Sequence, residues 1–244
     1  MVRFHGEPPT HSSYEELEAL GVRHAFTTRH HGSFPGPPFG GDLAALRALG
    51  IDGGTLRVAR QVHGATTLVV DGAPPGLVGT GDALATATPG MPLAIFTADC
   101  LAVIVADPER RVLALAHAGW RGTVAGLLGH LVEVLVSSFG VGPERLRAAV
   151  GPSIGPCCYE VDAPVVGPLR QAFPADWQRW TRPAGPGKWW LDLWQANTEQ
   201  LVAAGVRPEA ILNARLCTAC RRDLFFSYRR DGGGLRLAAV AVLP

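Results

Sequence analysis

A cysteine and a histidine lie at the same end of the most clearly predicted hairpin in this sequence. Residues 97–122 read TADCLAVIVADPERRVLALAHAGWRG, two apolar runs around the turn DPER (107–110). Asp followed by Pro is typical of a type I turn. With a two-residue loop in that turn, Cys100 lies directly opposite His117. Directly opposed residues share a face and have Cβ atoms about 4.5–5.5 Å apart. At that separation a thiolate and an imidazole can bind one metal ion.

A third ligand is available from another part of the chain. Taken singly, a buried cysteine is usually a small core residue. The opposition of Cys100 and His117, followed by Gly119 and Gly122 where backbone must approach something closely, favours a site instead. Of the eight histidines, His63 is the best placed, because it ends a predicted strand just before a glycine. Two histidines and one cysteine leave one position open, which is typical of a catalytic zinc site.

The elements that must position these residues predict a mixed α/β fold. We expect one domain over residues 1–244, with mixed β-sheets layered with outer helices and a central β-hairpin that carries the metal site. Residues 1–20 are polar, and we expect an N-terminal extension with one short helix. The longest predicted helix covers 123–140, where apolar residues keep a helical period. A Gly/Pro loop covers 30–41, and 168–190 shows the weakest pattern, so we expect least order there.

Composition excludes several classes of function. The chain has 244 residues, of which 47% are hydrophobic, so it can bury a sizeable core. Its net charge of +1 and lack of a basic block argue against nucleic acid or an anionic membrane as partner. No apolar run is long enough to span a membrane, and the N-terminal residues lack the apolar region of a signal peptide, so we expect neither. Five cysteines favour a reducing compartment. We therefore expect a cytoplasmic protein, a monomer or small homo-oligomer, with small-molecule partners.

Seven motifs together resemble the family of polyphenol oxidase or laccase-domain proteins. They are RQVHG (60–64), TGDALAT (80–86), TADCLAVIVAD (97–107), AHAGWRGT (116–123), GPSIGPCCYEV (151–161), CTAC (217–220) and LFFSYRRDGG (224–233). The resemblance covers about residues 22–242. The motifs are specific as a set, although each alone would be weak.

The resemblance implies an enzyme of nucleoside metabolism. Members of this family are understood as zinc-dependent purine nucleoside phosphorylases with adenosine deaminase side activity. The implied reactions are phosphorolysis of adenosine, inosine, guanosine and methylthioadenosine to base and ribose 1-phosphate, and hydrolytic deamination of adenosine. The family's zinc ligands fall on His63, Cys100 and His117, which agrees with the hairpin argument. The segment TRHHGSFPGPPFGGD (28–42) departs from the family, because it lacks an Asn-Leu-Gly stretch and has His31 where glycine is usual.

Phosphorolysis requires an anion site and a purine slot. Arginine suits phosphate because its planar guanidinium donates two parallel hydrogen bonds. The candidates beside the motif loops are Arg29, Arg121 and Arg229. An aromatic ring can stack on the purine. The candidates are Tyr228, Phe225, Phe226 and Trp120, two of which we expect to be core residues.

Two aspartates adjoin the predicted ligands. Asp99 precedes Cys100, where a carboxylate can act as a general base or accept a hydrogen bond from the second ring nitrogen of a metal-bound histidine. We therefore include Asp99 among the catalytic candidates, with a strand-end cap as the alternative. Asp82 can hold backbone or a ligand histidine, and we expect its role to be structural.

Three other functions compete with the zinc enzyme. Two histidines and a cysteine are also the blue-copper ligands, with Met91 as axial ligand, so a copper polyphenol oxidase is one alternative. A laccase also needs a trinuclear copper cluster, for which eight histidines, several of them poorly placed, are too few. A metal-free cysteine hydrolase with Cys100 as nucleophile and His117 as base is the second. A partner-binding protein with a purely structural metal is the third.

The CxxC motif CTAC (217–220) has its own alternatives. Thioredoxin-like chemistry places such a motif at the start of a helix, but Arg-Arg-Asp and a predicted strand follow here. A structural zinc site would need two more ligands, which Cys157 and Cys158 could provide. We favour plain thiols or a disulfide.

Overall fold

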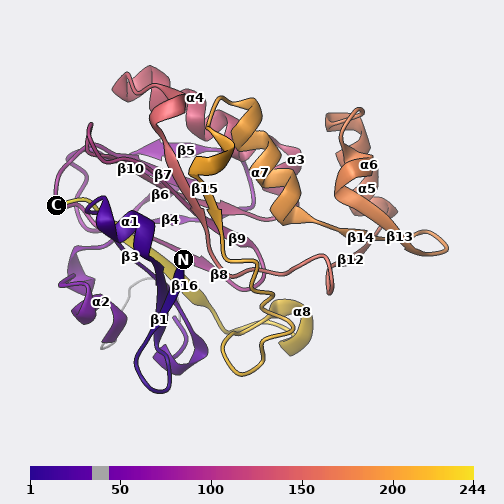
Figure 1. Ribbon diagram of the computed structural model, residues 1–244, viewed down its shortest axis with the longest axis horizontal. Helices are drawn as coiled ribbons and strands as arrows, with labels where there is room; N and C mark the ends of the chain where they lie inside the picture. Colours follow the sequence, from indigo (N-terminus) through magenta and orange to yellow (C-terminus); the bar gives the residue numbers. More distant parts are fainter. Residues whose placement is uncertain (35–43) are drawn as a thin grey trace.

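Two mixed β-sheets pack face to face in the computed structural model, which describes residues 1–34 and 44–244 (Figure 1). Of the described residues, seven strands form the first sheet, in the order β1 (Val2–His5), β2 (His11–Tyr14), β3 (Arg23–Thr27), β16 (Leu237–Val242), β8 (Leu93–Thr97), β4 (Arg57–Arg60) and β6 (Gly76–Thr80). Six form the second, in the order β15 (Ile211–Asn213), β11 (Arg147–Val150), β9 (Leu101–Asp107), β10 (Val112–Ala118), β7 (Ala83–Thr86) and β5 (Thr67–Val69). Both sheets contain parallel and antiparallel pairs, so the predicted mixed α/β class is confirmed.

The inner layer between the sheets is built by alternation along the strands. Successive side chains of a strand point to opposite faces. In β9, Ile104 points toward the other sheet and joins Leu115 of β10 and Ile95 of β8 in one buried cluster. Val103 and Val105 point the other way, toward the helices. All seven residues of β9 and all seven of β10 are buried, so the hairpin forms the centre of the molecule.

Helices cover the outer faces of both sheets. The helices α3 (Trp120–Val124), α4 (Leu127–Phe139) and α7 (Leu193–Ala203) lie over the six-stranded sheet, as Figure 1 shows. The predicted helix over 123–140 is in fact interrupted at Gly126, whose φ of 72° is left-handed and ends α3 before α4 begins. On the other side, α2 (Ala44–Ala48) lies against the seven-stranded sheet through Leu46. The remaining short helices of these layers are α1 (Glu15–Ala19) and α8 (Tyr228–Asp231).

Residues 160–191 form a lobe beside the two sheets. It consists of α5 (Ala163–Ala172), α6 (Trp177–Trp180) and a three-stranded sheet in the order β12 (Glu160–Asp162), β14 (Lys188–Leu191) and β13 (Thr181–Gly185). Figure 1 shows it projecting on the right. The expectation of least order over 168–190 was therefore wrong. Trp180 is 2% exposed, and its indole donates to Glu199 of α7 at 2.7 Å, so an aromatic anchor orders a segment whose pattern is weak.

The N-terminal residues contain the expected short helix, α1, but the residues before it form two strands of a sheet. β1 and β2 form a hairpin, and β2 pairs with β3 at the edge of the seven-stranded sheet. Tyr14 is 3% exposed and donates to the carbonyl of Val150 at 2.6 Å, which ties this edge to β11 of the other sheet. The strands escaped prediction because VRFH and HSSY are short and largely polar.

The hairpin register differs from the predicted one by two residues. Val112 pairs with Asp107, so the loop has four residues, 108–111, and His117 faces Ala102 rather than Cys100. The Asp107 carboxylate accepts from two loop N–H groups, and Arg111 takes a left-handed φ of 56° to close the loop. A type I turn in a two-residue loop would splay the strands. A shift of two keeps every side chain on its face, so Cys100 and His117 still share one side.

The predicted loop over 30–41 is described only in part. Residues 29–31 form a single 3₁₀ turn, whereas 35–41 lie outside the described residues, as do the first two residues of the predicted helix over 42–50. Among the described residues, no helix combines the length and apolar character that crossing a bilayer requires.

The layered core predicts a sharp contrast between two leucines. Leu115 is fully buried between the sheets, whereas Leu77 of β6 is 47% exposed. We expect Leu115→Ala to lower the free energy of unfolding by about 2–5 kcal/mol, because it removes buried methyl groups and leaves a cavity. The control Leu77→Ala should cost no more than about 0.5 kcal/mol. Urea denaturation of both variants measures the difference, and equal losses would contradict the two-layer packing.

Candidate metal centre

Two histidines and a cysteine bring their ligand atoms together at one end of the central hairpin. His63 lies in the loop after β4, Cys100 directly precedes β9, and His117 is in β10. Their ligand atoms all lie within 4.8 Å of one another. The imidazole rings of His63 and His117 meet edge to face, with centroids 4.8 Å apart. The three residues predicted from the sequence thus converge, and their donor set is the one that zinc takes in sites with one open position.

The carboxylate of Asp82 orients both histidines. It accepts from His117 Nδ1 at 2.9 Å, which leaves His117 Nε2 as the nitrogen that faces the site. It also accepts from the backbone N–H groups of Val62, His63 and Gly64, at 3.1, 2.9 and 2.7 Å. These bonds hold the His63 loop in a tight curve in which His63 has a φ of 60°. The structural role expected for Asp82 is therefore to hold backbone and a ligand histidine together.

The thiol and the imidazole beside it form an ion pair. Burial alone would raise the pKa of the Cys100 thiol, but hydrogen bonds with His117 and His63 outweigh it and lower the pKa to about 6. Burial would likewise lower the pKa of His117, whereas its contacts with Asp82 and Cys100 raise it to about 9. Cys100 is thus held as a thiolate next to positive charge. A metal cation bound to the same three atoms would stabilise the thiolate in the same way.

Two glycines allow the close approach expected of them. A Cβ at Gly119 would lie 2.8 Å from Cys100 Sγ and 3.2 Å from the His63 ring. A Cβ at Gly122 would lie 3.1 Å from the carbonyl oxygen of Gly64, in the His63 loop. Any side chain at Gly119 would fill the space into which the thiolate and the imidazole point. The bare backbone here therefore fits a bound ion.

The sequence suggested that Asp99 could accept a hydrogen bond from a metal-bound histidine. In the structure Asp82 accepts that hydrogen bond, from His117. The Asp99 carboxylate instead accepts from Thr218 Oγ1 at 2.6 Å, Ser227 Oγ at 3.0 Å and the backbone N–H of Arg229 at 2.6 Å. Asp99 is buried and has a left-handed φ of 84°. Its contacts make it an anchor that holds the 218–229 segment next to Cys100.

The three candidate arginines have different surroundings. The Arg29 guanidinium donates to the carbonyl of Arg222 and lies over the Phe226 ring, so it holds the 222–226 loop. Arg121 lies over the Trp120 ring with its Cζ 4.3 Å from the centroid. Arg229 donates to the Glu160 carbonyl at 2.7 Å.

Tyr159 is a member of this region that sequence reasoning missed. Arg229 Cζ lies 5.1 Å from the centroid of its ring. Burial raises the pKa of the Tyr159 phenol above its usual range; the charges of Cys100 and Asp99 act in the same direction, and those of Arg229 and Arg121 oppose them. The phenol, both guanidinium groups and the thiolate thus share one region. The signal was a tyrosine directly after the Gly/Pro/Cys loop of GPSIGPCCYEV.

Of the four aromatic candidates, two are core residues, as expected. Phe225 and Phe226 are 0% and 7% exposed and pack with Leu224 and Leu237. Tyr228 is 61% exposed on α8, next to Arg229 in the sequence. Its ring faces Gly233, at which a Cβ would lie 3.0 Å from the tyrosine ring.

Comparison with known proteins places this chain in a family. Residues 42–243 match the family described as multi-copper polyphenol oxidoreductase laccase. The chain belongs to this family. It is 41% identical over 241 residues to a protein from Deinococcus radiodurans named purine nucleoside phosphorylase, an alignment that covers 92% of this chain and 90% of that protein.

Other members of the family are similar in sequence and fold. Purine nucleoside phosphorylase YlmD from Geobacillus stearothermophilus is 43% identical over 152 residues, which is 62% of this chain and 56% of that protein. An adenosine deaminase from an unknown prokaryotic organism is 35% identical over 78% of this chain and 75% of its own length. The crystal structure of YlmD from Geobacillus stearothermophilus superimposes with a TM-score of 0.88 at 33% identity, covering 100% of this chain and 99% of that one.

The multi-copper chemistry in the family's description has no ligand set for a trinuclear cluster in the described residues. The Met91 sulfur accepts from Thr86 Oγ1 at 3.4 Å. Thr86 is the last residue of β7, so it lies about 13 Å along the strand from Asp82, which precedes that strand. All eight histidines lie in described residues, and only His63 and His117 belong to a group there with metal-ligand spacing. A trinuclear cluster requires several histidines around one place. Of the other six, His5 and His11 stack with ring centroids 4.5 Å apart, but none of the six joins a group of three or more ligands in the described residues.

The contacts of Asp82 predict that it controls metal affinity. Each carboxylate oxygen accepts from two N–H groups, so in Asp82→Asn the amide NH₂ faces two donors whichever way it is turned. We expect zinc affinity to fall by about 10- to 100-fold, as measured by competition with a chromogenic chelator. The free energy of unfolding should fall by about 1–3 kcal/mol for each donor left unpaired.

A second aspartate provides the matched control. Asp71 Oδ1 accepts from Thr86, Ala87 and Thr88, far from the ligands. Asp71→Asn should therefore lower stability without changing zinc affinity. Equal zinc affinity in the two variants would refute the role assigned to Asp82.

Proposed function

We propose that this protein is a zinc-dependent purine nucleoside phosphorylase that also deaminates adenosine. The observation that carries the proposal is the convergence of His63, Cys100 and His117 around a position that Gly119 leaves open, with Asp82 behind them. Relatives named purine nucleoside phosphorylase and adenosine deaminase support the two reactions. Zinc held by two imidazoles and one thiolate supplies Lewis acidity beside an open coordination position.

Phosphate is assigned to the guanidinium groups near Cys100. Arg229 lies over the half-buried Tyr159 ring, and the charges of Arg121, Arg229 and Cys100 all act on its phenol, which supports an anion site in this region. A planar guanidinium binds phosphate oxygens through two parallel N–H donors. Asp99 contributes by accepting from the backbone N–H of Arg229, which fixes where that side chain begins. Arg29 then serves to hold the 222–226 loop rather than to contact phosphate.

The purine is assigned to the exposed ring of Tyr228. A nucleoside base needs an apolar face on which to stack, and Tyr228 is 61% exposed while Phe225 and Phe226 are buried. Tyr228 precedes Arg229 on α8. The base would thus lie next to the phosphate and ribose positions, with α8 as the element that holds both contacts.

A metal-free cysteine hydrolase is the second candidate. Cys100, His117 and Asp82 form a thiolate, an imidazolium and a carboxylate in a row, which is the arrangement of a nucleophile, a base and the group that orients the base. His63 has no place in that scheme, yet it lies in the same group. The phosphorylase therefore accounts for one more residue of the site.

Product analysis separates these functions. We expect the zinc-loaded protein to convert adenosine to adenine and ribose 1-phosphate only when phosphate is present, and to form inosine with or without phosphate. Both activities should disappear in Cys100→Ser, because a thiolate ligand is lost, and in chelator-treated protein, where added zinc should restore them. Absence of any product from zinc-loaded protein would contradict the proposal. Hydrolysis that survives the chelator but not iodoacetamide would favour the cysteine hydrolase.

Substitution of one arginine tests the phosphate assignment. We expect Arg121→Ala to raise the KM for phosphate by about 10- to 100-fold, because charged hydrogen bonds to phosphate are lost, with a much smaller change in the KM for the nucleoside. Arg110→Ala, at the opposite end of the hairpin, is the control and should leave both values unchanged. An unaltered phosphate KM in Arg121→Ala would remove this residue from the anion site.

A further inference from the structure

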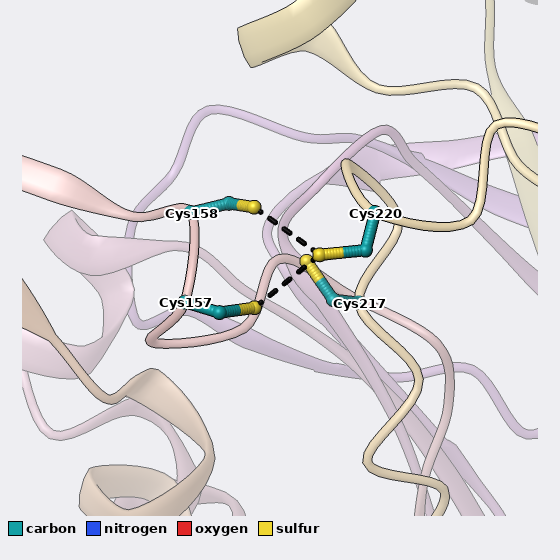
Figure 2. Close-up of side chains that lie close together, drawn as sticks. All are labelled: Cys157, Cys158, Cys217 and Cys220. Carbon is teal, nitrogen blue, oxygen red and sulfur yellow. Dashed lines mark hydrogen bonds between the residues drawn. The ribbon is translucent and has the colours of Figure 1, made fainter.

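Four of the five cysteines meet at a second place in the molecule. Cys157 and Cys158 lie in the loop between β11 and β12, and Cys217 and Cys220 lie in the loop between β15 and α8. Their Sγ atoms all lie within 4.8 Å of one another. Figure 2 shows the two pairs converging from separate loops, with Cys157 and Cys158 pointing toward Cys217 and Cys220. None of the four belongs to the group around Cys100.

The spacing of the sulfur atoms fits a tetrahedral metal site. Cys220 Sγ lies 3.4 Å from Cys158 Sγ and 3.5 Å from Cys157 Sγ. With zinc–sulfur bonds near 2.3 Å, tetrahedral geometry places sulfur atoms about 3.8 Å apart. All four residues are free cysteines rather than disulfide-bonded pairs. Four thiols at this mutual distance, rather than one bonded pair, are what a zinc site with four cysteine ligands requires.

The loops are built to present these thiols. The backbone N–H of Gly155 donates to the sulfur of the buried Cys217 at 3.3 Å. A Cβ at Gly155 would lie 2.6 Å from the Trp194 ring, so only glycine fits between that ring and the cysteines. The Arg230 side chain, 11% exposed, donates to the carbonyls of Thr218 and Ala219 at 2.9 and 3.1 Å. The CTAC loop is thus held in shape independently of the sulfur atoms.

We propose that Cys157, Cys158, Cys217 and Cys220 bind a second, structural zinc ion that joins the loop before β12 to the loop before α8. Four thiolates close the coordination sphere, so this ion holds structure and carries out no reaction. From the sequence we favoured plain thiols or a disulfide, because nothing in the sequence showed that the two loops converge.

The second ion would stabilise the surroundings of Cys100. Ile154, three residues before Cys157, donates its backbone N–H to the Asp99 carbonyl at 2.8 Å. Thr218, next to Cys217, donates its hydroxyl to the Asp99 carboxylate at 2.6 Å. Both loops therefore donate to Asp99, the residue before Cys100. A zinc ion that joins the loops would stabilise these contacts without binding any residue of the first metal group.

Metal content tests the proposal on the whole protein. Protein purified under reducing conditions with zinc should contain two zinc ions per chain by elemental analysis. Cys220→Ser should contain one, Cys100→Ser should contain one, and the double variant none. We also expect Cys220→Ser to unfold at a lower temperature than the wild type. One zinc ion in the wild type that Cys220→Ser retains would overturn the second site, and iron in place of zinc would overturn the choice of metal.

Two measurements on the unmutated chain remain decisive if Cys220→Ser does not fold. Cobalt-loaded protein should show thiolate-to-cobalt charge-transfer absorption about five times that expected for Cys100 alone, because four thiolates are added to one. Intact mass under non-reducing denaturing conditions should correspond to five free thiols. A mass lower by two hydrogens, or absorption from a single thiolate, would contradict the proposal. Neither readout depends on activity, so the second site can fail while the phosphorylase proposal stands, and the reverse.

Discussion

The metal centre depends on one buried carboxylate. Asp82 accepts from three consecutive backbone N–H groups, 62–64, and from His117 Nδ1. A buried carboxylate without such partners would cost several kcal/mol. Burial raises the pKa of Asp82, but the hydrogen bonds from His117, Gly64 and Val62 hold it below its usual range, so the group stays ionised. The same bonds curve the loop that carries His63 and select the His117 nitrogen that faces the site. One side chain thus orients two ligands from different elements.

The metal centre also depends on packed strands and on anchored loops. Cys100 and His117 are held by β9 and β10, whose residues are all buried between a second sheet and a layer of helices. Arg121 and Arg229 lie on the short helices α3 and α8, and Tyr159 lies in the loop before β12. Asp99 holds the 218–229 segment through its carboxylate and the loop that leads to Tyr159 through its carbonyl. Ligand atoms on packed strands can be placed more accurately than groups on loops. The loops therefore need their own anchors, which Asp99 and the four cysteines can provide.

The mixed fold and the shared side of Cys100 and His117 could be predicted because both follow from local periodicity. His63 was chosen for its place at the end of a predicted strand before a glycine, and the family resemblance agreed with that choice. The predicted register of the hairpin was wrong by two residues, but a shift of two keeps each side chain on its face, so Cys100 and His117 still share one side. Asp82 reaches His117 because Ala83 pairs with Ala116, a contact between β7 and β10 that spans 33 residues of chain. The four cysteines meet because β11 and β15 are parallel neighbours. No local pattern encodes either pairing, and the polar strands β1 and β2 lack the alternation that identifies a strand.

Crystals grown with zinc, with anomalous scattering measured at the zinc absorption edge, test most directly whether His63, Cys100 and His117 form one metal centre. The account predicts an anomalous peak within about 2.0–2.3 Å of an imidazole nitrogen of His63, of Cys100 Sγ and of His117 Nε2, with one coordination position not taken by protein. A zinc ion bound elsewhere, with no peak among these three residues, would contradict the account. A fourth protein ligand closing the sphere would contradict a catalytic role.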